Sequence, residues 1–313
     1  MKAIEIQNVS KSFGRLQAVS ELTLDIPEGA LCGLIGPNGA GKTTLFSMLA
    51  GFLRPSSGTM LVRGEPLIYG QPPVGKIAML PQDSTLPPRQ TARKVLELLA
   101  RYGGSSKGEA HQKAKRALEM VGLDQTQSEQ KISELSHGQR RRVAIAQTLL
   151  GENEIICLDE PTAGVDPRAA AELREMVVNM RGKRTIIFSS HNLLEVESIC
   201  THVAILNHGK LVTSGPIDQL RREEKVISVR LRIRPEAPDT LLAEIRMLEE
   251  IASAEWIDEE PIIRFSVSED KGSDEVVNSV VSLIIKHNGV LEGIKRGQSL
   301  EKRFLDETKS VTT

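Results

Sequence analysis

The sequence has few cysteines, no excess of charge of either sign and no long apolar segment. Three scattered cysteines fit a reducing compartment and argue against a disulfide framework or a zinc site. A balance of 40 Lys+Arg against 41 Asp+Glu argues against a polybasic nucleic-acid binder, because such proteins neutralise phosphates. No apolar run approaches the roughly 20 residues that cross a bilayer, and residues 1–13 lack the apolar stretch of a secretory signal. We therefore expect a cytoplasmic protein without a membrane span of its own.

The chain is long enough for two folded domains. Domains of about 150 residues predict two in a chain of 313. In the first two hundred residues, short apolar runs alternate with helical patterns, which is typical of parallel strands buried in an α/β sheet. The runs are Leu31–Ile35, Glu154–Leu158, Thr185–Phe188 and Val203–Leu206.

A helical insertion into this sheet domain is predicted over about residues 83–150. Thr91–Tyr102 and Glu109–Val121 have helical patterns, and the Gly/Ser-rich segment Gly103–Gly108 joins them. That segment also fits G-x-S-x-G, but a nucleophile elbow follows a strand, and here a helical pattern precedes it. We interpret it as a linker.

A small α+β domain is predicted over residues 223–313, after a sheet domain of residues 1–222. The alternation of apolar and polar residues after residue 226 is typical of a half-buried strand. The order of elements is β-α-β-β-α-β, the ferredoxin-like arrangement. The predicted strands are Ile227–Ile233, Ala254–Ile257, Ile262–Val267 and Val290–Ile294, and the predicted helices are Leu241–Ile251 and Val276–Ile284.

A glycine-rich motif follows the first apolar run. Residues Gly36–Thr43 read GPNGAGKT and match G-x-x-x-x-G-K-[ST], and a helical pattern continues over Thr44–Leu49. The glycines allow a tight turn whose N–H groups point at phosphates, and the helix amino terminus adds partial positive charge. We expect Lys42 to reach the β and γ phosphates of a nucleotide and the Thr43 hydroxyl to bind Mg²⁺.

The second candidate element is the apolar strand Glu154–Leu158, which ends in Asp159 and Glu160. Burying carboxylates is costly unless a cation or a hydrogen-bond network meets them. Alone, the pattern also fits a strand that ends in a solvated acidic turn. Beside a phosphate loop, Asp159 suits the Mg²⁺ shell, directly or through water, and Glu160 suits polarisation of the attacking water.

Leu135–Gln139 reads LSHGQ and precedes the acidic strand as the signature motif does in ATP-binding-cassette (ABC) ATPases. Over about residues 1–222 the chain resembles the nucleotide-binding subunit of an ABC transporter. The resemblance implies an α/β P-loop NTPase fold with a helical insertion, and hydrolysis of ATP with Mg²⁺. The loop and signature residues that it implies at ATP are Gly36, Asn38, Gly39, Ala40, Gly41, Lys42, Thr43, Thr44, Ser136, Gly138 and Gln139.

Other family elements follow in order along the chain. Phe13 resembles the aromatic residue that stacks on adenine, and Gln82 resembles the glutamine that links Mg²⁺ and water to the membrane partner. Ala163–Asp166 resembles the D-loop, which places Asp166 among the nucleotide-binding residues, and His191 resembles the switch histidine at the γ-phosphate. The implied catalytic residues are Glu160, His191 and Gln82, and the implied Mg²⁺ ligands are Thr43, Gln82 and Asp159.

The signature motif also predicts a dimer. Ser136 and Gln139 form a capping-box pattern, and Ser136 with the helix amino terminus would offer donors to a γ-phosphate. In this family that phosphate belongs to the other subunit, so two chains would enclose two nucleotides head to tail. ATP would close the dimer and hydrolysis would release it. Both composite sites look complete, which favours a homodimer over a pair with a paralogue.

Three residues depart from the usual family pattern. His137 stands where glycine is usual, Phe13 replaces the commoner tyrosine and keeps a stacking face, and Val165 replaces leucine. We interpret His137 as a helix-start residue without a catalytic role. The basic run Arg140–Arg142 is interpreted as a solvated helix face or an internal ion-pair partner.

The predicted function is an ATPase subunit that powers a separate integral membrane permease from the cytoplasmic face of the membrane. Ser299–Leu305 resembles the S-L-E-x-x-F-L ending of ABC-2-type exporter ATPases, which implies export, and a terminal helix is predicted over Ser299–Glu307.

One alternative is an ABC ATPase that acts on DNA or ribosomes. The absence of a coiled coil, a second cassette and a basic excess argues against it, so no nucleic acid is expected. Another makes residues 223–313 a ligand-binding or dimerisation module that regulates the ATPase.

Overall fold

The computed structural model describes residues 1–70, 75–222, 226–233, 235, 237–257, 261–267 and 273–296. The chain divides into two compact units, Met1–Gly215 and Pro216–Thr313. The sequence predicts a boundary after residue 222, whereas the structure groups helix α8 (Ile217–Arg222) with the second unit. Among the described residues, no helix has the length and apolar character that crossing a membrane requires.

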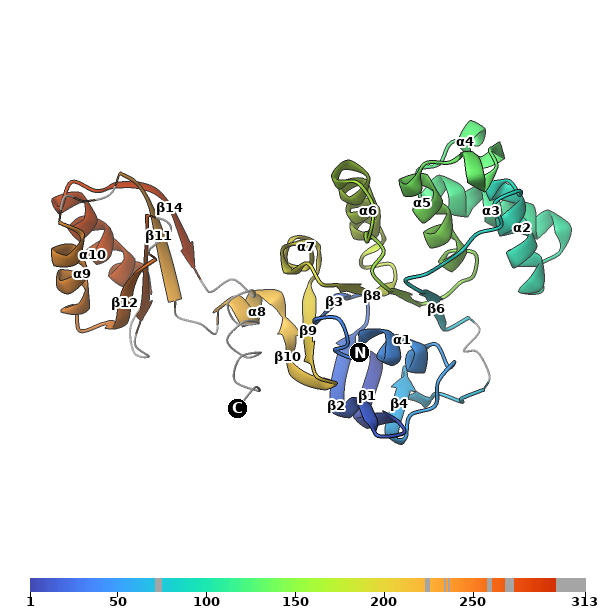
Figure 1. The fold of residues 1–313 in the computed structure, drawn as a ribbon, viewed down its shortest axis with the longest axis horizontal. Coiled ribbons are helices and arrows are strands. Elements are labelled where there is room, and N and C mark those ends of the chain that lie inside the picture. Colours follow the sequence, from blue (N-terminus) through green and yellow to red (C-terminus); the bar gives the residue numbers. More distant parts are fainter. Residues whose placement is uncertain are drawn as a thin grey trace. The chain divides into compact units, whose positions relative to one another are not determined.

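A six-stranded sheet forms the centre of the first unit, in the order β10-β9-β3-β8-β7-β6 (Figure 1). Strands β3, β6, β7, β8 and β9 run parallel. Every residue of β3, β7 and β8 is buried, as in a sheet covered on both faces. The α/β class and the four strands predicted from apolar runs are confirmed. The strands are β3 Leu31–Ile35, β6 Ile77–Leu80, β7 Ile155–Leu158, β8 Thr185–Ser190, β9 His202–Asn207 and β10 Lys210–Pro216.

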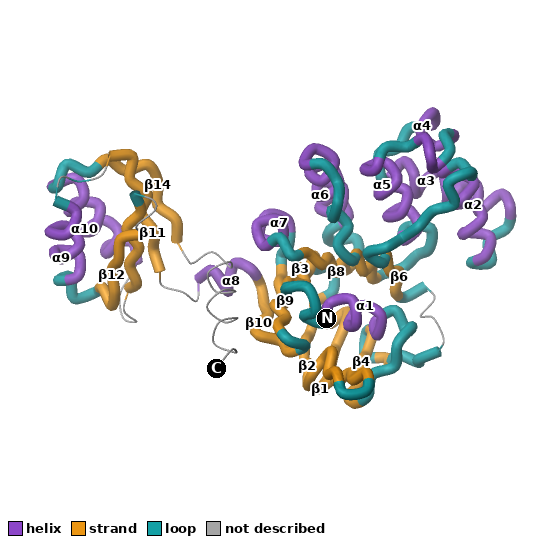
Figure 2. Tube along the Cα trace, in the orientation of Figure 1, coloured by secondary structure: helices purple, strands orange, loops and turns teal. Residues whose placement is uncertain are grey.

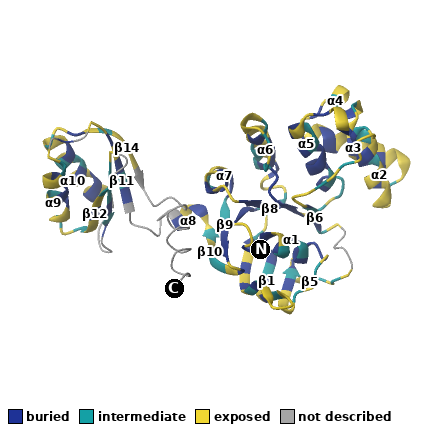
Figure 3. Ribbon diagram, in the orientation of Figure 1, coloured by how far each residue is buried: buried dark blue, intermediate teal, exposed yellow. Residues whose placement is uncertain are grey.

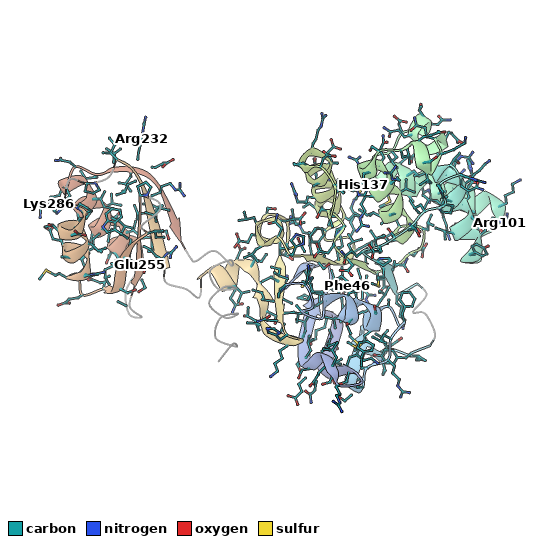
Figure 4. The ribbon with its side chains drawn as sticks, viewed as in Figure 1. Phe46, Arg101, His137, Arg232, Glu255 and Lys286 are labelled. Atoms are coloured by element: carbon teal, nitrogen blue, oxygen red, sulfur yellow. The ribbon has the colours of Figure 1, made fainter. Side chains whose placement is uncertain are left out.

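A second, antiparallel sheet of the order β2-β1-β4-β5 packs against helix α1 (Lys42–Leu49). Phe46 of α1, labelled in Figure 4, belongs to one buried core with Ile6 of β1 and Leu34 of β3. Buried stretches of the ribbon are dark blue in Figure 3. This sheet is not predicted from the sequence, because register shifts interrupt the alternation along β1. Its strands are β1 Lys2–Phe13, β2 Leu16–Pro27, β4 Ser57–Val62 and β5 Glu65–Pro66.

The helical insertion is confirmed (Figure 2). Side-chain caps set where its helices begin. Thr91 caps α2 by accepting a hydrogen bond from Lys94 N, and Ser106 starts α3 with a capping box. Helix α3 therefore begins at Lys107, inside the segment predicted as a linker. The insertion contains α2 Ala92–Tyr102, α3 Lys107–Met120, α4 Gln125–Glu129, a 3-10 turn at Ile132–Glu134 and α5 His137–Thr148; α6 Pro167–Met180 and α7 Leu193–Ile199 follow.

The second unit has the predicted β-α-β-β-α-β order and an antiparallel sheet β12-β13-β11-β14, which confirms the ferredoxin-like arrangement. Helix α9 ends earlier than predicted, because Ile251 opens β12 instead of closing the helix. The predicted terminal helix Ser299–Glu307 and the motif Ser299–Leu305 lie outside the described residues. The elements are β11 Val226–Ile233, α9 Pro238–Arg246, β12 Ile251–Ile257, β13 Ile262–Val267, α10 Ser273–Lys286 and β14 Val290–Arg296.

Gly33 of β3 is the position where the central sheet tolerates no side chain. A Cβ atom there would lie 2.1 Å from Val196 Cγ1 and 3.2 Å from Cys200 Sγ. We expect Gly33→Ala to lower the free energy of unfolding by roughly 1–3 kcal/mol, because over-packing strains a rigid core. Denaturant titration followed by circular dichroism measures the loss. In a Val196→Ala background, which removes the clashing methyl, the loss should shrink; an equal loss in both backgrounds would contradict the packing argument.

Candidate active site

The loop between β3 and α1 is wound tightly around the Lys42 side chain. Gly39 and Gly41 have φ values of 82° and 100°, a left-handed conformation that glycine adopts without strain. Lys42 is the first residue of α1 and is only 7% exposed. Its Nζ donates hydrogen bonds to Gly36 O at 2.6 Å and Pro37 O at 3.3 Å. The loop thus presents an ammonium group and a helix amino terminus to the same space, which suits a phosphate.

The electrostatics of Lys42 also favour an anionic ligand. Burial lowers the pKa of Lys42, although the carboxylates of Glu160 and Asp159 act in the opposite direction. Lys42 Nζ lies 3.8 Å from Glu160 Oε1. A phosphate at the loop would add negative charge beside a desolvated ammonium, which favours its charged form.

Asp159 lies directly after β7, where this strand comes close to α1 and β8, and its carboxylate is fully buried. Its Oδ2 accepts a hydrogen bond from Thr43 Oγ1 at 2.8 Å, and its Oδ1 accepts one from Ser189 Oγ at 2.6 Å. A hydroxyl and a carboxylate are thereby adjacent, with Gln82 lining the same cavity. Thr43, Asp159 and Gln82 each offer an oxygen atom as a metal ligand, which is the ligand type that Mg²⁺ prefers, so these residues fit that ion.

Glu160 occupies a strained backbone conformation beside this pair. Its φ of 47° lies in the left-handed region, which costs a residue with a Cβ about 1–3 kcal/mol. The side chain is nearly buried, and its Oε2 lies 2.8 Å from Nδ1 of His191, whose own side chain is exposed. The carboxylate therefore lies between a buried ammonium group and an imidazole at the surface.

A cavity of about 560 Å³ connects the loop to Phe13. Phe13 is 48% exposed, and Lys11 Nζ lies 5.2 Å from its ring centroid, within cation–π range. His208 and Leu16 also line this cavity and are not predicted as site residues, since neither lies in a motif. The cavity brings together the predicted residues Phe13, Asn38, Gly39, Ala40, Gly41, Lys42, Thr43, Thr44, Gln82, Asp159 and Glu160.

The signature residues lie together at a different place. The predicted capping box is confirmed: Gln139 N donates to Ser136 Oγ at 3.1 Å, and Ser136 N donates to Gln139 Oε1 at 2.8 Å. Asp166 caps α6 by accepting from Ala169 N. A cavity of about 290 Å³ is lined by Ser136, Gly138, Gln139 and Asp166, none of which lines the first cavity. Within one chain, the predicted site residues thus form two groups.

The structure also places the residue that departs most from the family pattern. His137 is the first residue of α5 and is exposed, in agreement with its interpretation as a helix-start residue (Figure 4). Gly138 after it is buried, and a Cβ there would lie 2.8 Å from Ala169 Cβ. The close packing of α5 on α6 therefore requires glycine at 138 but not at 137.

Two residues that hold the site together are not predicted from the sequence. Ser189 of β8 links the two acidic residues, because its Oγ donates to the Asp159 carboxylate and accepts from the backbone N–H of Glu160 at 2.8 Å. Arg141, expected in a solvated or ion-paired run, is 9% exposed and donates to backbone carbonyls after β7. Its helical spacing from Gly138 and Ile145, both buried, is the signal that places it on the buried face.

Comparison with known proteins gives one consistent result. The family model for ABC transporters matches residues 19–163. An uncharacterized ABC transporter ATP-binding protein of Bacillus subtilis, YhaQ, is 36% identical over 220 residues, 70% of this chain and 73% of the relative. The Nod factor export ATP-binding protein I of Cupriavidus metallidurans is 32% identical over 219 residues, 69% of this chain and 72% of the relative. The dimeric ATP-binding cassette MJ0796, solved with ADP and Pi, shares the fold with a TM-score of 0.61 at 23% identity, covering 68% and 98% of the two chains.

Lys42→Ala tests the phosphate loop directly. We expect the affinity for ATP to fall roughly 10–100-fold, because a charge-assisted hydrogen bond is worth about 1.5–3 kcal/mol. Isothermal titration with a non-hydrolysable ATP analogue measures the change. Lys210→Ala, which removes an exposed lysine from β10, serves as the matched control and should bind as the wild type does. Unchanged affinity in Lys42→Ala would remove Lys42 from the site.

Proposed function

The chain belongs to the ABC transporter family, and we propose that it is the ATP-hydrolysing subunit of an exporter whose membrane permease is a separate chain. The observation that carries the proposal is the Glu160 carboxylate, held between the Lys42 ammonium of the glycine-rich loop and His191. A carboxylate in that position can accept a proton from water beside the γ-phosphate. The name of the Cupriavidus relative supports export as the direction of transport.

The predicted residues in and beside the first cavity have distinct roles in this proposal. Glu160 orients and polarises the attacking water. His191 contacts both the γ-phosphate and the Glu160 carboxylate and so fixes their relative positions. Lys42 and the loop N–H groups neutralise charge on the β and γ phosphates. Phe13 provides a stacking face for adenine.

Mg²⁺ fits the remaining donors. Thr43 and Asp159 would hold the ion, with Gln82 completing the oxygen set. When bound, the ion supplies charge neutralisation and alignment for the phosphates. The buried carboxylate of Asp159 is already oriented for this role by the Ser189 hydroxyl.

We propose that two copies of this chain form the working ATPase. Ser136, Gly138, Gln139 and Asp166 line a cavity of their own in the single chain, which supports a role at the nucleotide of a partner copy. The dimeric state of the MJ0796 cassette is in keeping with this arrangement. The pair would bind the permease at the cytoplasmic face of the membrane.

Residues 223–313 are proposed as an accessory or regulatory domain. The second unit has a buried core of its own, centred on Val229, Ile245 and Phe265, which supports an independent module. A ligand or partner of this module would set the ATPase rate, and this role is compatible with transport. The transport names of the relatives favour transport over action on DNA or ribosomes.

Glu160→Gln separates hydrolysis from binding. We expect turnover to fall at least about 100-fold while ATP affinity is retained, because the amide cannot take the proton from water. Phosphate release at saturating MgATP measures turnover. Glu154→Gln at the opposite end of β7, where the exposed carboxylate pairs with Arg63, is the control and should remain active. Turnover near that of the wild type in Glu160→Gln would refute the assignment.

Ser136→Arg tests the dimer. In the Glu160→Gln background, ATP should produce a stable dimer in light scattering coupled to gel filtration, since hydrolysis no longer releases it. Adding Ser136→Arg should abolish the dimer and leave ATP binding intact, because the bulky cation blocks the signature surface. Ser282→Arg, on an exposed position of α10, should leave it unchanged. A dimer that persists with Ser136→Arg would exclude the head-to-tail arrangement.

A further inference from the structure

The guanidinium of Arg141 is buried among backbone acceptors and uses all five of its N–H groups. Its Nη2 donates to Glu160 O at 2.8 Å and Asp159 O at 3.1 Å, and its Nε donates to Pro161 O at 2.8 Å. Its Nη1 donates to Gln82 O at 3.0 Å and to Ser84 Oγ at 3.4 Å. One side chain from α5 thereby joins the loop after β6 to the segment after β7.

The neighbouring arginines of α5 do not make this connection. Arg140 donates to Leu135 O, and Arg142 donates to Val121 O and pairs with Glu172. Arg141 alone of the three donates to the segment that carries the two carboxylates. Burial lowers the pKa of Arg141, with Asp159, Asp83 and Glu160 acting against it. Arginine stays charged in proteins even where burial lowers its pKa. Here the buried cation donates to peptide oxygens rather than pairing with a carboxylate at the surface.

These bonds act on the backbone of Glu160. Glu160 has a left-handed φ of 47°, and such a conformation persists only where the surroundings determine it. Ser189 Oγ accepts from Glu160 N at 2.8 Å, so it holds the peptide before Glu160. Arg141 Nη2 takes both Asp159 O and Glu160 O, so it holds the peptides on both sides.

We propose that Arg141 is a positioning residue for ATP hydrolysis, acting through Glu160. It keeps the Glu160 backbone in the left-handed conformation that directs the carboxylate toward Lys42 and His191, and it fastens the loop of Gln82 to the same peptides. This inference rests on the proposed ATPase function. Because Arg141 does not line the nucleotide cavity, its loss should affect the chemical step and leave nucleotide binding intact.

The full-length chain carrying Arg141→Met tests the proposal. Methionine fills similar space but donates no hydrogen bond. Turnover is measured at saturating MgATP and divided by the number of sites that bind a non-hydrolysable ATP analogue, so that unfolded molecules do not count. We expect turnover per site to fall about 10–100-fold, with the analogue dissociation constant within about twofold of the wild-type value. Arg140→Met, on the same helix, is the matched control and should retain wild-type turnover per site.

Arg141→Lys separates charge from geometry. Lysine keeps the buried cation but has three donors that cannot reach five acceptors at once, so we expect partial recovery relative to Arg141→Met. Full recovery would show that charge alone suffices and would overturn the positioning role. If Arg141→Met does not fold, Arg141→Lys decides: a fall of about fivefold or more per site supports the proposal, and a smaller change overturns it.

The remaining outcomes separate this inference from the proposed function. Wild-type turnover per site in Arg141→Met overturns the inference alone. A loss of analogue affinity as large as the loss of turnover also overturns it, because Arg141 would then serve binding or the general fold. No turnover in the wild-type chain, or unchanged turnover in Glu160→Gln measured alongside, overturns the ATPase assignment itself.

Discussion

Two carboxylates buried side by side at the end of one strand determine what must surround them. Asp159 is fully buried and Glu160 is 6% exposed, so both need polar partners close by. Those partners come from α1, β8 and the segment after β8, while Arg141 of α5 donates to the backbone carbonyls of both residues. The parallel sheet, in which β3, β7 and β8 end at the same edge, brings these segments together. The site therefore depends on the strand order as much as on its motifs.

Local motifs were predictable because the contacts that fix their geometry are made within a few residues along the chain. The glycine-rich turn before Lys42 and the Ser136–Gln139 cap each need only neighbouring backbone, and the structure contains both as predicted. The buried position of Arg141 was not predicted, because its hydrogen-bond partners lie 18 to 59 residues away in the sequence. The antiparallel sheet was missed for a related reason, since its register shifts are defined by strand pairing. What the sequence leaves open is which distant backbone a side chain meets.

The second unit follows the same division between local and tertiary information. Alternation along β11, the helical spacing of apolar residues in α9 and α10, and the apolar stretches of β12, β13 and β14 predicted the order of its elements. The end of α9 was not predictable, because Leu248 and Ile251 continue the apolar spacing beyond the helix. In the structure both residues pack against the core from outside α9, so burial rather than helical period explains their apolar character.

The cap of α5 shows how one hydroxyl can serve folding and recognition at once. Ser136 Oγ accepts the cap hydrogen bond from Gln139 N, which leaves its own hydrogen free to point outward. Aspartate would cap the helix equally well, but it would turn a negative charge toward any anion that approaches this helix end. Helix stability alone therefore does not explain the choice of serine. Substitution by aspartate would keep the fold while making the surface repel phosphate.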